Sequence, residues 1–109
     1  MLFRSDKAKG ANARTIAEVI AKSTELKDKP VLVRAKVVKF NGGIMGKNWI
    51  HVRDGSGSAS DGSNDLLVTT TEQASVGDVV NVEGVVRTDK NFGSGYAYKV
   101  MVEDAKVKK

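Results

Sequence analysis

The chain has 109 residues, 40% of them apolar, which is the composition of a single globular domain rather than of a disordered or fibrous polypeptide. It contains no cysteine, which excludes disulfides, thiolate metal sites and cysteine nucleophiles, and no run approaches the roughly 20 apolar residues of a membrane-spanning helix. Residues Met1 to Gly10 carry charges where a signal peptide would be apolar, so we expect no export signal there.

The formal charge of +5 is distributed unevenly along the chain. Residues 1–60 contain 12 basic and 5 acidic side chains, whereas residues 61–109 contain 6 and 8. A basic surface favours an anionic partner. A modest net charge also keeps a small domain in solution without any partner. The charge alone leaves both interpretations open.

The N-terminal part is predicted to contain a tail followed by one helix. Residues 1–14 have no apolar periodicity, and we expect a flexible tail there. Thr15 and Glu18 have the spacing of a capping box, which predicts a helix over residues 15–26. Its apolar side chains recur on one face, at Ile16, Val19, Ile20 and Leu26. Pro30 lies just beyond, and the residue before a proline disfavours helical geometry.

From Val31 onward the apolar period changes to two, which predicts β-strands at residues 30–40, 48–54, 65–71, 79–87 and 96–106. Asn41-Gly42-Gly43 is predicted to be the first turn, and Gly84 a bulge or bend that curls the sheet. The polar stretch from Gly55 to Asn64 is predicted to be an exposed, flexible loop. We therefore expect an all-β fold: a five-stranded barrel preceded by a short N-terminal α-helix, in one domain over residues 15–109.

The segment from Met45 to Gly57 reads Met-Gly-Lys-Asn-Trp-Ile-His-Val-Arg-Asp-Gly-Ser-Gly. It resembles the hairpin of the anticodon-binding OB domains of class II aminoacyl-tRNA synthetases. The chain more closely resembles small bacterial OB-fold proteins that are described as nucleic-acid binders and are often exported or lipid-anchored. The Thr-Ile-Ala-Glu run at residues 15–18 and the Val-Gly-Asp-Val-Val run at 76–80 carry that likeness, which covers about residues 14–107. The resemblance implies an OB barrel, nucleic-acid binding and a periplasmic or exported location.

The OB barrel usually binds its ligand across strands two and three, between the loops that join strands one to two and four to five. Strand alternation and these loops give a candidate surface that is both basic and aromatic, formed by Arg34, Lys36, Lys47, Trp49, His51, Arg53, Thr69, Phe92 and Tyr96. Cations follow the phosphates of a single strand, and flat rings stack on its bases. Trp49 is the expected stacking platform, although it could instead pack under the helix or into the barrel end.

The sequence offers little for catalysis or metal binding. His51 is the only histidine, and a lone imidazole without nearby carboxylates does not make a metal site. Asp54, Ser56, Ser58 and Asp65 have the offsets of a calcium loop, but Ala59 stands where that loop needs glycine. Glu103 and Asp104 are expected on opposite faces of a strand, so they form no acid–base pair. We expect no enzymatic activity, no cofactor and no metal.

Two functions are compatible with these residues. The first is a module that binds single-stranded nucleic acid through the basic and aromatic face, with steep salt dependence. The second is an exported accessory protein that uses the barrel for contacts with a protein partner or for self-association, for example by edge pairing of strands. The basic first half of the chain suits both.

Overall fold

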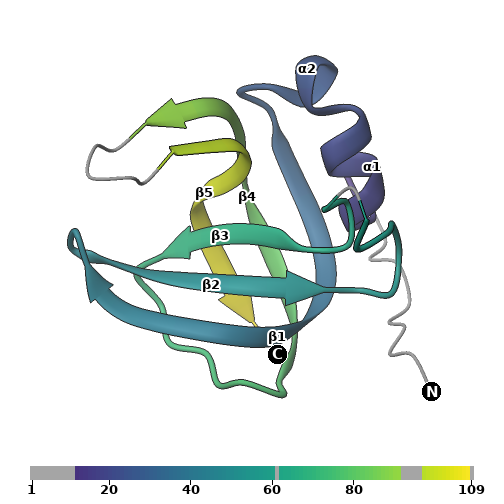
Figure 1. Ribbon diagram of the computed structural model, residues 1–109. Helices are drawn as coiled ribbons and strands as arrows, with labels where there is room; N and C mark the ends of the chain where they lie inside the picture. Colours follow the sequence, from purple (N-terminus) through teal and green to yellow (C-terminus); the bar gives the residue numbers. More distant parts are fainter. Residues whose placement is uncertain (1–11, 61, 92–96, 109) are drawn as a thin grey trace.

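Five strands form one closed sheet with the order β1-β2-β3-β5-β4 (Figure 1). The computed structural model describes residues 12–60, 62–91 and 97–108. The strands are β1 (Pro30–Ile44), β2 (Lys47–Arg53), β3 (Leu66–Thr70), β4 (Val79–Asn91) and β5 (Ala97–Lys108). The pair β3–β5 is parallel, and the others are antiparallel. This confirms the expected all-β, OB-like barrel.

The barrel interior is filled by the residues that the period of two places inward. On β1 the buried residues are Val31, Val33, Ala35 and Val37, and on β2 they are Ile50 and Val52. β-branched residues pack well on a pleated surface, which explains the preference for valine. No helix in the described part of the chain has the length and apolar character that a membrane crossing requires.

The first hairpin is longer than expected. β1 continues through Asn41, Gly42 and Gly43 to Ile44, and the turn lies at Met45 and Gly46, with φ angles of 53° and 75°. Positive φ at both central residues is the signature of a type I′ hairpin turn. The two glycines instead lie at a register irregularity of the β1–β2 pair, so the predicted turn at residues 41–43 was wrong.

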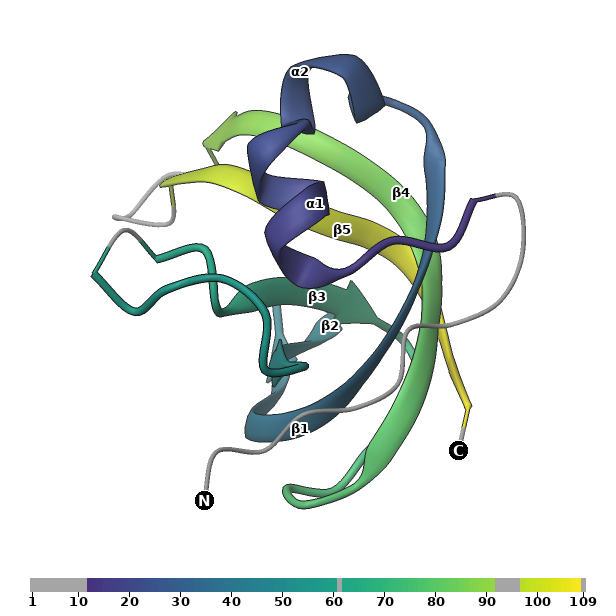
Figure 2. The ribbon, with the colours of Figure 1, turned by 90° about the vertical axis from the view of Figure 1, so that its right-hand side faces the viewer.

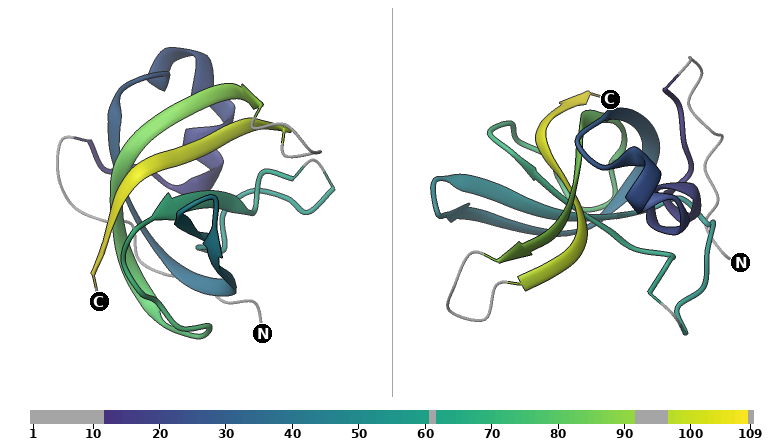
Figure 3. Two further views of the ribbon diagram at one scale, coloured as in Figure 1. Left: turned by 90° about the vertical axis from the view of Figure 1, so that its left-hand side faces the viewer. Right: turned by 90° about the horizontal axis from the view of Figure 1, so that it is seen from above.

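The expected helix is present but divided. It consists of α1 (Ile16–Ala21) and α2 (Ser23–Leu26), and Thr15 and Glu18 form the capping box that the sequence predicts. Ile16, Val19 and Leu26 join the barrel core from either side of the break. Figures 2 and 3 show both helices beside the barrel, away from the tip of the β1–β2 hairpin.

The residues just before α1 belong to the fold. Ala13 forms a parallel bridge with Leu32, and the N–H of Arg14 donates to the Leu32 carbonyl at 2.9 Å. Ala13 is 4% exposed. Residues 12–14 of the predicted tail therefore pair with β1, and residues 1–11 lie outside the described part of the chain.

A buried carboxylate joins β2 to α1. Asp54 follows β2, is 5% exposed, and accepts hydrogen bonds from the backbone N–H of Ile16 at 2.9 Å and of Ser56 at 3.0 Å. The Ser56 hydroxyl donates to the same carboxylate and accepts from the N–H of Ala17 at 3.0 Å. The Asp-Gly-Ser sequence thus satisfies N–H groups that the start of a helix leaves without intrahelical partners.

The bend predicted at Gly84 is confirmed as a bulge between β4 and β5. Glu83 pairs with Lys106 and Val85 with Glu103, so two residues of β5 oppose Gly84. A β-carbon on Gly84 would lie 2.8 Å from the Glu103 carbonyl oxygen, closer than packing allows. A bulge of this kind increases the local bend and twist that barrel closure needs.

Replacing Asp54 tests the connection between β2 and α1. We expect Asp54→Ala to lower the free energy of unfolding by about 2 to 4 kcal/mol, because it leaves several buried N–H groups without an acceptor. Asp54→Asn keeps an acceptor and should cost about 1 kcal/mol. Urea denaturation followed by circular dichroism measures both values.

The control for this test is Asp78→Ala, which removes a carboxylate whose hydrogen bond with the Ser75 N–H is exposed. It should cost no more than about 1 kcal/mol. Equal losses for Asp54→Ala and Asp78→Ala would show that the buried carboxylate has no special role.

Candidate functional site

The outer side of β1 and β2 carries a row of cations. From Pro30 to Arg53 the sequence contains five lysine and arginine residues and neither aspartate nor glutamate. Lys36 lies opposite Arg53, and Lys39 opposite His51, and residues directly opposite in a sheet share a face. We call this surface the basic face; it consists of Arg34, Lys36, Lys39, His51 and Arg53.

Asp65 holds two of these side chains. It precedes β3, and its carboxylate accepts a hydrogen bond from His51 Nδ1 at 2.7 Å and from Arg53 Nε at 3.0 Å. Partial burial raises the pKa of Asp65, but the hydrogen bonds and positive charges of His51 and Arg53 outweigh burial, so that its pKa lies below the ordinary value. Asp65 is therefore ionised at neutral pH and fixes the direction of both side chains.

Lys39 also belongs to the basic face, a position that strand alternation does not predict. Simple alternation from Lys36 places Val38 outward and Lys39 inward. A register shift between Val37 and Lys39 reverses this order, because a bulge puts the following residues on the other face. Lys39 is exposed beside His51. The one signal in the sequence for an outward Lys39 is its charge, because a lysine side chain is almost never fully buried.

Trp49 lies on the outer side of β2, where its ring is covered. It is 4% exposed and packs with Leu67, Met101, Ile44 and Tyr98; its ring centroid is 5.7 Å from that of Tyr98. Its indole N–H donates to the Ile44 carbonyl at 2.8 Å. The ring thus lies neither under the helix nor inside the barrel, but it is not an open stacking platform in this conformation.

The other outer residue predicted on β3 is buried as well. Thr69 lies opposite Trp49 and is 1% exposed. Its hydroxyl oxygen has no hydrogen-bond partner among the described residues. A ligand on the basic face would therefore not reach Thr69 without movement of the side chains above it.

Lys47 and Arg34 lie at the two ends of the predicted surface. Lys47, at the start of β2, is 3.6 Å from the carboxylate of Glu103. Arg34 is exposed on β1, opposite Asn81 of β4. The remaining two candidates, Phe92 and Tyr96, lie outside the described residues. The structure therefore brings together Arg34, Lys36, His51 and Arg53 on the basic face. Trp49 and Thr69 lie beyond His51 but are buried, and Lys47 is engaged with Glu103.

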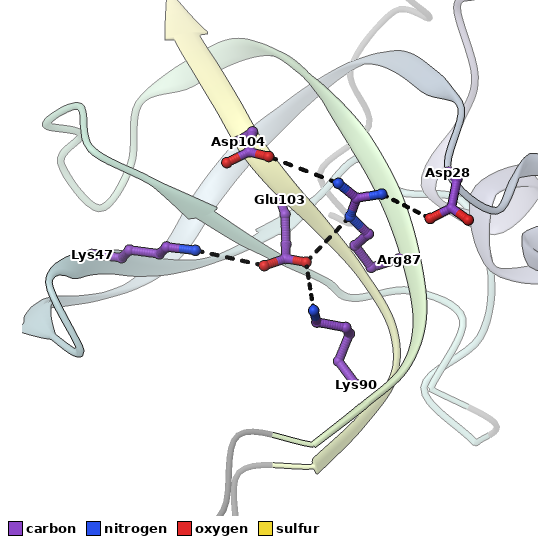
Figure 4. A network of polar contacts seen from close by, with 6 residues as sticks. All are labelled: Asp28, Lys47, Arg87, Lys90, Glu103 and Asp104. Carbon is purple, nitrogen blue, oxygen red and sulfur yellow. Dashed lines mark hydrogen bonds and ion pairs between the residues drawn. The ribbon is translucent and has the colours of Figure 1, made fainter.

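A network of charges surrounds Glu103 (Figure 4). Besides Lys47, the carboxylate contacts Arg87 Nε at 3.3 Å and Lys90 Nζ at 3.4 Å, and Glu103 is 6% exposed. Arg87 also contacts Asp28 at 2.7 Å and Asp104 at 3.9 Å. The expectation that Glu103 and Asp104 point to opposite faces was wrong, because Asp104 has a φ of 54° in the bulge and both carboxylates contact Arg87.

The loop after β2 is exposed, as expected, but it is closed by internal hydrogen bonds. The N–H of Ser58 donates to Ser63 Oγ at 2.8 Å, and the N–H of Ser63 donates to the Ser58 carbonyl at 3.1 Å. Within the described ranges, no group of three or more His, Asp or Glu side chains is placed to hold a metal ion. Asp54, which the calcium-loop spacing includes, is engaged with α1.

Together these observations define an OB-like barrel with a basic outer face. No protein-family model and no curated protein matches the sequence. The chain is similar to the crystal structure of a Leishmania major Friedlin protein described as an aspartyl-tRNA synthetase, with a TM-score of 0.60 and 17% identity. The match covers 98% of this chain and 23% of that chain, so this chain spans about a quarter of its neighbour's length. This likeness shows the shared fold.

The contacts of Asp65 predict a pH dependence of stability. A carboxylate with a lowered pKa stabilises the fold above its unfolded pKa, near 3.8, and this contribution is lost as the pH falls through the folded value. We expect Asp65→Asn to lower the free energy of unfolding by at most about 1 kcal/mol at pH 6, because the pair is partly exposed. The difference between the two proteins should begin to shrink as the pH falls below the unfolded pKa near 3.8, and it should vanish only below the lower folded pKa.

Urea denaturation of both proteins at several pH values measures this difference. The matched control is Asp89→Asn, which changes an exposed carboxylate of β4. A difference between wild type and Asp65→Asn that stays constant from pH 6 to pH 3 would contradict the assignment.

Proposed function

We propose that this chain is a non-enzymatic module that binds single-stranded nucleic acid on the basic face. The observation that carries the proposal is the acid-free run from Pro30 to Arg53, in which the β1–β2 register places Lys36 opposite Arg53 and Lys39 opposite His51. Neighbouring lysine and arginine side chains can contact successive phosphates of a nucleic-acid strand. Their binding releases the counterions of those phosphates, which favours association. The carboxylate of Asp65 contacts this face and orients His51 and Arg53.

A partly accessible aromatic side chain lies near this face. Tyr98 is half-buried against Trp49 and lines a groove of about 610 Å³, together with residues of the two helices, β4 and the segment before β3. Asp65 lines the same groove, which therefore adjoins the basic face. Its described lining contains two lysines, Lys27 and Lys99, and two carboxylates, Asp65 and Asp89. A tyrosine beside lysines supports binding of unpaired bases, which can stack on a ring.

The structural comparison supports the proposal at the level of the fold. The similar structure contains a barrel of this kind. It is described as an aspartyl-tRNA synthetase, a name that implies a transfer RNA as substrate. The alternative of edge pairing with a protein has less support, because the five strands close into one barrel. Residues 38–44 of β1 nevertheless have only β2 beside them, so this part of the strand keeps one edge without a neighbouring strand among the described residues. An exported location, implied by the family resemblance, is a separate proposal.

Fluorescence anisotropy of a labelled single-stranded oligonucleotide tests the proposed function. We expect wild-type binding to weaken steeply between low and moderate salt. The double variant Arg34→Ala/Lys39→Ala should bind more weakly to all sequences, and the slope of log K against log salt should fall by about 1 to 2, because up to two phosphate contacts are lost.

Lys29→Ala serves as the control, because it removes an exposed positive charge that precedes β1. Its salt slope should match that of the wild type. Affinity that does not change with salt would contradict the proposal. Absence of binding, together with a scattering mass that rises with protein concentration, would instead favour self-association.

A further inference from the structure

A cavity of about 500 Å³ lies between the C-terminal end of β2 and the loop that follows it. Two residues of the basic face, Lys36 and Arg53, contribute to its lining. The others come from β1 and the loop: Val38, Gly55, Ser56, Gly57, Ser58, Ala59 and Asn64. Figure 2 shows this loop extending from the barrel below α1. The cavity is therefore an extension of the basic face.

Hydrogen bonds fix the wall that the loop provides. Asp54 holds Ser56 at its start, and the paired hydrogen bonds between Ser58 and Ser63 close it further along. Gly57 has a φ of 77°, and a β-carbon there would overlap the backbone carbonyl of Ser63. The loop backbone around Gly57 is therefore held in one conformation, and it forms one wall of the cavity.

The lining favours an anion. Among the described residues that line the cavity, none is acidic and two are cations. Arg53 uses Nε for Asp65, and its two terminal nitrogens have no hydrogen-bond partner among the described residues. A guanidinium held in this way presents a planar pair of donors that matches phosphate oxygens. The side-chain amide of Asn64 adds a neutral donor.

The lining also favours a group larger than a bare ion. Val38 and Ala59 supply apolar surface, and the volume exceeds what a single phosphate fills. Two cations match the two negative charges of a phosphomonoester better than the single charge of a phosphodiester. A nucleoside attached to the phosphate would cover the apolar part of the lining.

We propose that this cavity binds a nucleoside phosphomonoester, with the phosphate between Lys36 and Arg53. Two sources share this chemistry: a free mononucleotide, and the phosphorylated end of a strand that lies on the basic face. The second source rests on the proposed function, whereas the first does not.

Calorimetric titration of the full chain with adenosine 5′-monophosphate, with adenosine and with inorganic phosphate tests the site. We expect the monophosphate to bind at least about tenfold more tightly than adenosine, because charge-assisted hydrogen bonds are lost without the phosphate. Lys36→Ala should lower the affinity for the monophosphate about tenfold, and the control Lys29→Ala should leave that affinity unchanged.

Two further variants separate binding from folding. Arg53→Ala also removes a contact of Asp65, so we compare it with Ala59→Leu, which fills the cavity and keeps every charge. Ala59 is exposed in the loop, and we expect this variant to keep the wild-type circular dichroism spectrum while it loses monophosphate binding. Unchanged monophosphate affinity in both Lys36→Ala and Ala59→Leu would overturn the proposal.

Anisotropy with matched oligonucleotides distinguishes the two sources and the two proposals. Tighter binding of a 5′- or 3′-phosphorylated strand than of the unphosphorylated strand supports the strand end as the source. Salt-sensitive binding that ignores the end groups, with no monophosphate binding, overturns the cavity proposal and leaves the proposed function intact. Monophosphate binding without any oligonucleotide binding supports the cavity proposal and overturns the proposed function.

Discussion

The buried carboxylate of Asp54 joins the two parts of this fold. Helix α1 has six residues, fewer than a helix needs to be stable alone in water, so its place depends on contacts outside itself. Asp54 supplies one of these by accepting the N–H of Ile16, and the burial of Ile16 and Val19 in the barrel supplies the rest. The same carboxylate holds Ser56, so one side chain positions both the helix and the loop that walls the cavity.

The positions of the strands along the chain were predictable because inward valines alternate with outward polar residues over most of the chain. The effect of the bulges on which side chains face outward was not predictable. A bulge reverses the faces of all residues that follow it, and its position depends on the partner strand. One bulge moves Lys39 onto the basic face, and another lets Glu103 and Asp104 meet Arg87. Gly84 was a local signal for the second bulge, whereas Val38 gave none for the first.

The candidate site was predictable where a single physical rule decides exposure. A charged side chain keeps its charge in water, so Arg34 and Arg53 are exposed as alternation predicts. An outward aromatic ring can be exposed or covered by another ring. Trp49 is covered in part by Tyr98, 49 residues later in the chain, and no pattern near Trp49 encodes that contact. The exposure of an aromatic candidate can therefore be judged only from the tertiary structure. The exposure of a charged candidate follows from little more than the strand register.

The distribution of carboxylates separates the basic face from the rest of the barrel. Glu103 contacts Lys47, Arg87 and Lys90, and Asp28 and Asp104 also contact Arg87. Three carboxylates thus balance three cations locally, and this part of the barrel attracts a distant anion weakly. The basic face meets Asp65 instead, which uses His51 and one nitrogen of Arg53. Through Lys36 and Arg53, the basic face continues into the lining of the cavity beside β1 and β2. Because Asp54 fixes the loop on the far side of that cavity, a ligand bound there would also stabilise α1, and by reciprocity a loosened loop would bind the ligand more weakly.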